Sequence, residues 1–316
     1  MSKYLVTGGA GFIGSHVVEH LLKSGDKVTV LDNFSSGKTE NLAHLDEKNL
    51  TVVEGDIRDA DLVNKTARYA EYIVHLAALP SVSRSVEDPL LTNEINVNGT
   101  LNVLEAARKW KKGVKRVIFA SSSSAYGDTP TLPKSESMRP QPMSPYAVSK
   151  LTGEYYCHAY FENYGVETVA LRFFNVFGPR QDPSSDYAAV VPLFTTRLLR
   201  RLKPVIYGDG KQTRDFTFVE NVVYGIQQAA GAHKVQGDAF NIACGERVTI
   251  TGLANMIGGI AGWTTEPRYK DARAGDVRHS LADISQAEEV MNYRVRVSLH
   301  EGLQRTVDWY QTQVAE

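Results

Sequence analysis

A glycine-rich turn near the start of the chain places the strongest constraint on its fold. The segment Thr7–Gly14 (TGGAGFIG) follows a short apolar run and opens a helix-length amphipathic segment. Gly8 permits a tight turn, Gly11 lets the backbone approach a pyrophosphate, and Gly14 permits close helix packing. The start of the helix adds unpaired N–H groups and the positive end of a helix dipole. This strand–turn–helix unit predicts a dinucleotide-binding fold.

Short β-branched runs alternate with amphipathic segments of helix length through most of the chain. Such repetition implies a parallel sheet that is covered by helices on both faces. We therefore predict an α/β fold, a doubly wound, Rossmann-like parallel sheet with a smaller mixed α/β lobe. The expected strands cover 4–6, 28–31, 51–53, 72–76, 116–120, 168–171 and 239–242, and the expected helices cover 12–24, 60–69, 93–110 and 146–164.

The alternation of predicted strands and helices ends after Phe174, where prolines and a Gly-Asp-Gly turn at 208–210 interrupt it. We expect the chain to leave the sheet there and to return to it over about 215–243. The predicted division is a dinucleotide-binding domain of residues 1–174 plus about 215–243, and a second lobe of about 175–214 plus 244–316.

The bulk composition excludes several classes of protein. Lys plus Arg is 35 and Asp plus Glu is 36, which argues against a dominant nucleic-acid or membrane-surface role. Cys157 and Cys244 form no CxxC pattern, and the eight histidines show no metal-ligand spacing, so we expect neither a disulfide framework nor a metal site. No signal-peptide shape and no apolar run near the roughly 20 residues of a membrane span occur. We expect a cytoplasmic protein.

A serine run and a tyrosine–lysine pair carry the candidate chemistry. Ser121 to Ser124 follow an apolar run expected to be a buried strand, so their hydroxyls are expected at the carboxyl end of the sheet, where such folds hold ligands. Tyr146 and Lys150 are one turn apart on a predicted helix. A free tyrosine has a pKa of about 10, and a neighbouring ammonium favours the phenolate and lowers that pKa. This arrangement predicts coupled transfer of a proton and a hydride.

Two acidic residues follow predicted strands in the dinucleotide-binding part. Asp32 ends the second strand, where an acid grips a ribose diol, and its charge favours NAD over NADP. Asp56 follows the third strand. Contact with the adenine edge and a turn or helix-capping role are equally good interpretations of Asp56.

Several motifs in order resemble the extended short-chain dehydrogenase/reductase family, and within it the UDP-hexose 4-epimerases, especially the UDP-N-acetylglucosamine/UDP-glucose branch. The resemblance covers nearly the whole chain. It rests on the glycine turn, the serine run and the segments 96–100 (NVNGT), 144–150 (SPYAVSK), 171–179 (LRFFNVFGP), 208–216 (GDGKQTRDF) and 273–276 (RAGD).

That resemblance implies an activity and a set of roles. Tyr146 takes the proton of the sugar 4-hydroxyl while NAD takes the C4 hydride, and Ser122 or a neighbouring serine relays the proton. Lys150 grips the nicotinamide ribose. The diphosphate-anchored 4-keto sugar then swings and is reduced on its other face, so NAD is recycled. The implied cofactor contacts are Gly8, Gly11, Phe12, Ile13, Gly14, Asp32, Asn33, Asp56, Ile57, Leu76, Ala77, Ala78, Asn96, Lys150 and Phe173.

The resemblance also implies substrate contacts and a substrate preference. Ser280 stands where some family members have a bulky tyrosine that limits the room at the sugar C2 substituent, so an N-acetyl group is expected to fit. The segment 187–192 also resembles the N-acetylhexosamine-accepting branch. We expect UDP-N-acetylglucosamine and UDP-N-acetylgalactosamine as substrates, with UDP-glucose and UDP-galactose as a second pair. The implied contacts are Ser123, Ser124, Asn175, Tyr187, Val191, Tyr207, Arg214, Arg273 and Ser280.

Departures and alternatives remain. Pro80 stands where many glucose-specific epimerases have lysine, and the sequence leaves open whether Arg84 compensates. A UDP-glucuronate 4-epimerase would need a partner for the carboxylate, and Arg84 is the one nearby candidate. A 4,6-dehydratase would need an acid pair where Ser123 and Ser124 stand. A non-catalytic NAD-sensing protein is the third alternative. Family members often dimerise through helices equivalent to 93–110 and 146–164, so we expect a homodimer.

Overall fold

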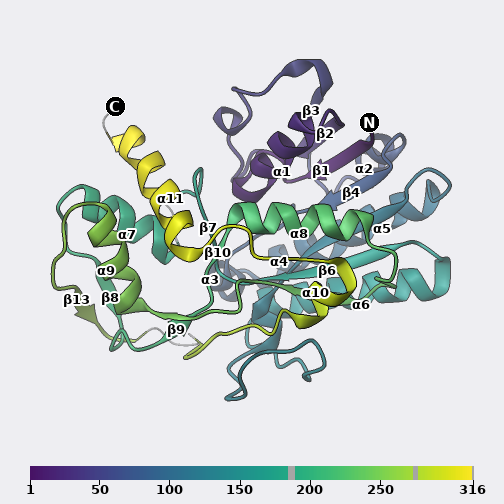
Figure 1. Cartoon of the computed structure of the whole chain (residues 1–316). Coiled ribbons are helices and arrows are strands. Elements are labelled where there is room, and N and C mark those ends of the chain that lie inside the picture. Colours follow the sequence, from purple (N-terminus) through teal and green to yellow (C-terminus); the bar gives the residue numbers. More distant parts are fainter. Residues whose placement is uncertain (184–188, 273–276, 315–316) are drawn as a thin grey trace.

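A parallel sheet forms the centre of the molecule (Figure 1). The computed structural model describes residues 1–183, 189–272 and 277–314. Within them, seven strands pair in the order β11-β6-β5-β4-β1-β2-β3, each parallel to its neighbour. Their bounds are β1 Lys3–Thr7, β2 Lys27–Asp32, β3 Leu50–Glu54, β4 Tyr72–His75, β5 Arg116–Ser122, β6 Thr168–Phe173 and β11 Ala239–Ile242. The predicted doubly wound sheet is confirmed, and every predicted strand lies in it.

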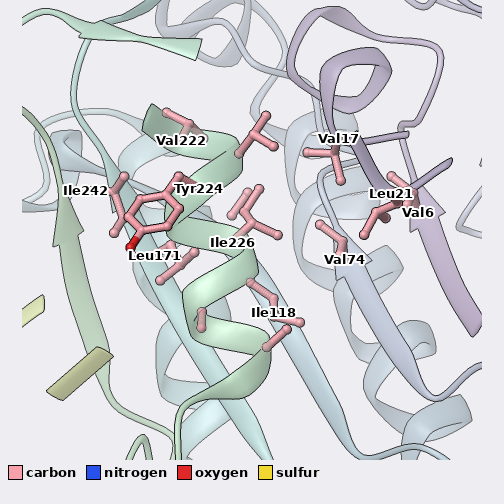
Figure 2. Close-up of a cluster of buried hydrophobic side chains, with 14 of the residues drawn as sticks. Val6, Val17, Leu21, Val74, Ile118, Leu171, Val222, Tyr224, Ile226 and Ile242 are labelled. Atoms are coloured by element: carbon pink, nitrogen blue, oxygen red, sulfur yellow. The ribbon is translucent and has the colours of Figure 1, made fainter. Parts of the chain in front are cut away.

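Helices cover both faces of this sheet, which is why its strands are continuous apolar runs. On one face lie α1 (Phe12–Lys23), α8 (Val219–Gly231) and α10 (Ser285–Met291). Figure 2 shows how Val222 and Ile226 of α8 meet Ile118 and Leu171 of the central strands. The opposite face is covered by α2 (Ala60–Ala67), α5 (Gly99–Lys109) and α6 (Pro145–Tyr164). Burial on both sides makes the sheet a rigid platform for residues at its carboxyl end.

The expected helix over 93–110 is divided. Glu94–Asn98 forms a π-helical turn, η3, before the regular helix α5 begins at Gly99. The amide of Asn96 bonds the backbone of Leu79, so tertiary contacts of this side chain accompany the wider turn. Single π turns of this kind often occur at functional sites. The other short helical elements of the dinucleotide-binding part are α3 (Val82–Glu87), α4 (Pro89–Asn93), η1 (Thr39–Asn41), η2 (Glu47–Asn49) and η4 (Ser123–Tyr126).

A second lobe has its own core. Aromatic and aliphatic side chains such as Phe194, Phe216 and Leu253 are buried there, away from the sheet. The helices are α7 (Val190–Leu199), α9 (Ile250–Ile260) and α11 (Leu299–Val314). Three small strand pairs complete it: β7 (Val176–Phe177) with β10 (Thr217–Phe218), β9 (Thr213–Arg214) with β12 (Val248–Thr249), and β8 (Val205–Tyr207) with β13 (Arg268–Lys270). No helix in the described parts of the chain is long and apolar enough to cross a membrane.

Candidate active site

The glycine turn after β1 lies tightly against the end of β4. Gly8 has a φ of +71°, and a Cβ atom on it would lie 2.8 Å from the nitrogen of Ala77. A Cβ atom on Gly14 would lie 2.0 Å from the Gly8 oxygen. Gly11 is the N-cap of α1 and makes no side-chain capping bond, so the helix start keeps N–H groups directed at the turn. This cradle fits a pyrophosphate.

Asp32 connects the end of β2 to that turn. Its side chain is buried, and its two oxygens accept hydrogen bonds of 2.9 Å from the backbone N–H groups of Ala10 and Phe34. A carboxylate has about four acceptor sites. Asp32 therefore keeps capacity for the two hydroxyls of a ribose while these bonds fix its orientation.

The loop after β4 is tied to helix α6 through Asn96. Its amide oxygen accepts a 2.7 Å bond from the N–H of Leu79, and its nitrogen donates to the Ser149 hydroxyl at 3.0 Å. Leu76, Ala77 and Ala78 lie half-buried in this loop. Asn96 thus positions the loop whose residues the resemblance assigns to cofactor binding.

Ser122, Tyr146 and Lys150 meet at the carboxyl end of β5. Helix α6 begins with Ser144 as N-cap, whose hydroxyl accepts a 3.2 Å bond from the backbone N–H of Ala147, and Pro145 follows in the first turn. Tyr146 therefore stands in the first turn, with its phenol hydrogen-bonded to Ser122. The Lys150 ammonium lies 6.0 Å from the centre of the Tyr146 ring.

Burial dominates the acid–base properties of this group. It lowers the pKa of Lys150 to about 8, although the ammonium donates a 2.8 Å bond to the carbonyl of Ala120. It also raises the pKa of Tyr146, while the hydrogen bond from Ser122 acts in the opposite direction. The sequence predicted a lowered tyrosine pKa. The difference arises because desolvation of the phenol outweighs an ammonium whose first partner is a backbone carbonyl.

The hydrogen bonds distinguish the four serines. Ser121 is buried and donates to Glu154, so it faces the core. Ser124 donates a 2.9 Å bond to the hydroxyl of Ser122, and Ser123 opens η4 in a half-buried position. The contacts favour Ser122 as the serine beside Tyr146, the point that the sequence left open by one residue.

Sequence reasoning missed the ion pair that fixes α6 to the sheet. Glu154 follows Tyr146 and Lys150 at steps of four along α6, and Arg172 of β6 binds its carboxylate with two hydrogen bonds of 2.9 and 2.6 Å. Both side chains are about 5% exposed. The sequence offered one indication of this pair, because Glu154 lies on the same face of α6 as Tyr146 and Lys150. A planar guanidinium that binds both oxygens holds the helix in one orientation.

An apolar cleft of about 280 Å³ lies in the second lobe. Its walls include four predicted substrate contacts, Asn175, Val191, Tyr207 and Arg214. Ser280 is buried next to it, because its N–H donates a 3.0 Å bond to the carbonyl of Thr213. The predicted contacts Tyr187 and Arg273 lie outside the described residues.

Comparison with known proteins identifies the relatives of this fold and site. The profile of the family described as GDP-mannose 4,6 dehydratase matches residues 5–306. The chain belongs to the extended short-chain dehydrogenase/reductase family. The solved UDP-N-acetylglucosamine 4-epimerase of Methanobrevibacter ruminantium M1, in complex with UDP-N-acetylmuramic acid, is 42% identical, with 99% of each chain covered and a TM-score of 0.94.

Two further members of this family show how far the similarity extends. The UDP-glucose 4-epimerase of Mycolicibacterium smegmatis is 41% identical over 309 residues, 97% of each chain. The UDP-glucose 4-epimerase of Thermus thermophilus, solved in complex with NAD, is 36% identical, with 98% of this chain and 99% of that chain covered and a TM-score of 0.87. The similarity therefore spans both lobes.

The carboxylate of Asp56 is bound by side chains of this chain. Arg58 binds its carboxylate with bonds of 3.0 and 2.8 Å, and the side chain of Asn33 adds one of 2.9 Å. The hydrogen bonds from Arg58 lower the pKa of Asp56 to about 2, and burial only partly opposes this. These contacts favour the turn interpretation over the adenine contact. Ile57 is buried against Gly99, and Phe173 ends β6 in a buried position.

Asp215 is a second residue that sequence reasoning did not single out. Its buried carboxylate accepts bonds of 3.0 to 3.1 Å from the backbone N–H groups of Cys244, Gly245 and Ala282. Its own carbonyl accepts a 2.9 Å bond from the Asn175 amide. Asp215 therefore joins its own segment, which carries Arg214, to the segment of Ser280 through its carboxylate and to Asn175 through its carbonyl. Only its place beside Arg214 in a quoted motif pointed to it.

Proposed function

We propose that this chain interconverts UDP-N-acetylglucosamine and UDP-N-acetylgalactosamine at C4, with UDP-glucose and UDP-galactose as a second pair. More broadly, the chain is an NAD-dependent UDP-sugar 4-epimerase. The observation that carries the proposal is the hydrogen bond between Ser122 and Tyr146, with the Lys150 ammonium 6.0 Å from the tyrosine ring. The same end of the sheet carries the glycine turn that fits a pyrophosphate.

The residues present fit NAD. The Gly8 turn and the start of α1 would hold the pyrophosphate, Asp32 the adenosine ribose, and Lys150 the nicotinamide ribose. When bound, NAD supplies a hydride acceptor and donor for C4 of the sugar. Because epimerisation has no net redox change, the same cofactor serves every turnover.

The proton follows a path made of this chain's own hydroxyls. Tyr146 receives the proton of the sugar 4-hydroxyl, either directly or through Ser122, and returns it to the same oxygen in the second half of the reaction. Ser124 donates to Ser122 and so holds its oxygen toward the phenol. Tyr146 must start as a phenolate to accept this proton, and the positive charge of Lys150 favours that form. The proton and the hydride both return to the sugar, so the step balances.

A small residue at position 280 supports N-acetylated substrates. The backbone at Ser280 is fixed, because its N–H donates to the carbonyl of Thr213 and Asp215 binds the N–H of Ala282 two residues on. Replacement by tyrosine adds a ring and is expected to reduce kcat/KM for UDP-N-acetylglucosamine by at least about tenfold while UDP-glucose is little affected. An equal loss for both sugars would contradict this specificity role.

The decisive test is an assay of purified protein with UDP-N-acetylglucosamine, UDP-glucose or UDP-glucuronate and no added NAD, followed by chromatography of the products. A 4-epimer from the first two sugars is expected. If neither sugar is epimerised, the proposal fails. Epimerisation of UDP-glucuronate alone would favour the alternative, in which Arg84, exposed on α3, meets the carboxylate. The dehydratase alternative is weaker because Ser123 and Ser124 provide no acid pair.

We also infer a homodimer. Exposed apolar side chains gather on α3, α4 and α6, and these helices pack together. They are Val82, Val86, Leu90, Val148 and Tyr155. The predicted surface over 146–164 shares in this patch, whereas the exposed residues of α5 include charged ones such as Arg108. Sedimentation at micromolar concentration is expected to give twice the chain mass, and a single-chain mass would contradict the inference.

A further inference from the structure

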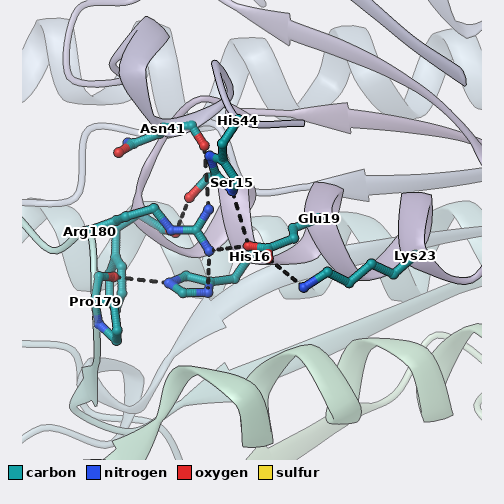
Figure 3. Close-up of polar contacts among 9 residues, drawn as sticks. Ser15, His16, Glu19, Lys23, Asn41, His44, Pro179 and Arg180 are labelled. Atoms are coloured by element: carbon teal, nitrogen blue, oxygen red, sulfur yellow. Dashed lines mark hydrogen bonds and ion pairs between the residues drawn. The ribbon is translucent and has the colours of Figure 1, made fainter. Parts of the chain in front are cut away.

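A polar cluster joins the cofactor-binding helix to a segment far away in the sequence (Figure 3). The imidazole of His16 on α1 contacts the carbonyl of Pro179 through Nε2 at 2.9 Å and the guanidinium of Arg180 through Nδ1 at 2.6 Å. Burial and the Arg180 charge lower the pKa of His16 to about 4. The imidazole is therefore neutral at pH 7, with Nδ1 accepting from Arg180 and Nε2 donating to Pro179.

Arg180 is the centre of this cluster. Its guanidinium also binds Glu19 of α1 at 2.7 Å and the backbone carbonyl of Asn41 at 3.4 Å, and its side chain is 10% exposed. Its backbone has a φ of +66°, which residues with a side chain rarely adopt. Such strain persists where the surroundings enforce it and often marks a functional position. One side chain thus bridges α1, the segment after β7 and the loop after β2.

The loop after β2 reaches from this bridge to the cofactor turn. The N–H of Lys38 and the side-chain amide of Asn41 both donate to the carbonyl of Ala10, at 3.0 and 2.8 Å. A Cβ atom on Gly37 would lie 2.8 Å from Asp32, so the loop also presses against the ribose-binding carboxylate. The ammonium of Lys38 adds an ion pair of 3.0 Å to Asp182. The two segments are therefore fastened to each other and to the turn.

We propose that Arg180 and His16 form a latch that retains NAD by holding the loop 37–44 and the segment 179–182 over the adenosine side of the cofactor site. In this fold, the ribose next to adenine lies at the end of β2, where this loop begins. Release of the cofactor then requires the loop to move, and the latch opposes that movement. This inference rests on the proposed function, because a recycled cofactor is one that must stay bound between turnovers. Arg180 and His16 are positioning residues and touch no reacting atom.

The test compares Arg180→Met with Lys23→Met. Both substitutions remove a cation from Glu19, but Lys23 is 74% exposed and, among the described residues, its ammonium pairs only with Glu19 of its own helix. Purified proteins are assayed for bound NAD per chain. NAD dissociation is then followed by transfer into an excess of a soluble dehydrogenase that consumes free NAD. We expect dissociation at least about tenfold faster in Arg180→Met, because several charge-assisted bonds are lost, and no change in Lys23→Met.

A second variant, His16→Phe, tests the latch independently in case Arg180→Met does not fold. His16→Phe keeps a ring beside Phe12 but removes both hydrogen bonds, and it is expected to speed NAD release in the same direction. All rates are measured well below the unfolding temperature of each variant. If both variants are folded and release NAD at the wild-type rate, the latch is refuted, even if their unfolding temperatures fall. Because no sugar is present, this outcome is separate from a failure of epimerase activity in the wild-type protein.

Discussion

The catalytic group and the substrate cleft are built in opposite ways. Ser122, Tyr146 and Lys150 come from the end of one strand and the first turns of one helix, which the Glu154–Arg172 ion pair fastens to the sheet. The cleft draws its walls from segments spread over residues 175–250 and includes few charged groups. The first region is organised by neighbours in sequence, and the second by tertiary anchors. We therefore expect changes in the first to affect chemistry, and changes in the second to affect binding.

Tyr146→Phe is expected to have the largest effect. The substitution keeps the ring but removes the hydroxyl that moves the proton, so kcat is expected to fall by about 10³-fold, within the usual range for general acid–base groups. Bound NAD per chain is expected to stay unchanged, because the phenol holds no part of the cofactor in our assignment. Product chromatography and NAD content measure the two quantities. Turnover near the wild-type rate would remove Tyr146 from the mechanism and favour a binding role for the protein.

Ser122→Ala and its neighbour Ser121→Ala sharpen the contrast within one strand. Loss of Ser122 is expected to lower kcat by about 10²-fold, because the phenol loses its hydrogen-bond partner. Ser121 donates to the buried carboxylate of Glu154, so its loss is expected to reduce the free energy of unfolding by roughly 2 kcal/mol with a smaller effect on kcat. Steady-state rates and urea denaturation check the pair. A larger kcat effect at Ser121 would reverse the assignment.

The features that the sequence predicted are local ones, and those that it did not predict depend on distant contacts. The sheet, the glycine turn and the placing of Tyr146 and Lys150 one helical turn apart depend on local periodicity and short spacings, so the sequence indicated them directly. The π turn at Glu94–Asn98, the Glu154–Arg172 pair and the anchor at Asp215 depend on partners far away in the chain. The shift in the pKa of Tyr146 was predicted in the wrong direction, because the spacing of Tyr146 and Lys150 does not reveal how deeply the phenol is buried.

Lys150→Met tests whether the buried catalytic group costs stability. Burial lowers the lysine pKa from 10.5 to about 8. Below pH 8 the ammonium is charged in both states, and its burial opposes folding. Between pH 8 and 10.5 the unfolded chain binds more protons, so this cost disappears as pH rises. After partial offset by the lost bond to Ala120, the variant is expected to gain about 2 kcal/mol at pH 7.

Urea denaturation of protein stripped of NAD measures this gain at several pH values. The advantage of Lys150→Met over the wild type is expected to shrink between pH 8 and 10.5, while its turnover is reduced at every pH. Lys23→Met, at an exposed position, serves as the control with little change in stability. An unchanged stability at pH 7 would mean that the ammonium is better compensated than its single bond to Ala120 indicates.

Asp215→Asn is expected to have the smallest effect and to fall on binding alone. The substitution keeps the volume of the side chain but replaces one acceptor oxygen by an NH₂ group, which then faces either the N–H of Cys244 or those of Gly245 and Ala282. The segments that carry Arg214 and Ser280 then lose a common anchor. We expect KM for the UDP-sugar to rise by about tenfold, with kcat within a factor of about three and NAD content unchanged.

Whether KM changes alone or together with kcat decides how the result for Asp215→Asn is interpreted. Asp215 contacts no catalytic residue, so a rise in KM alone indicates that the cleft is assembled by its tertiary anchor. A fall in kcat of the same size as the rise in KM would instead show that the cleft and the catalytic group are mechanically joined. Loss of bound NAD would extend that link to the cofactor turn. Either result would break the separation between a locally built reaction centre and a distantly anchored binding site.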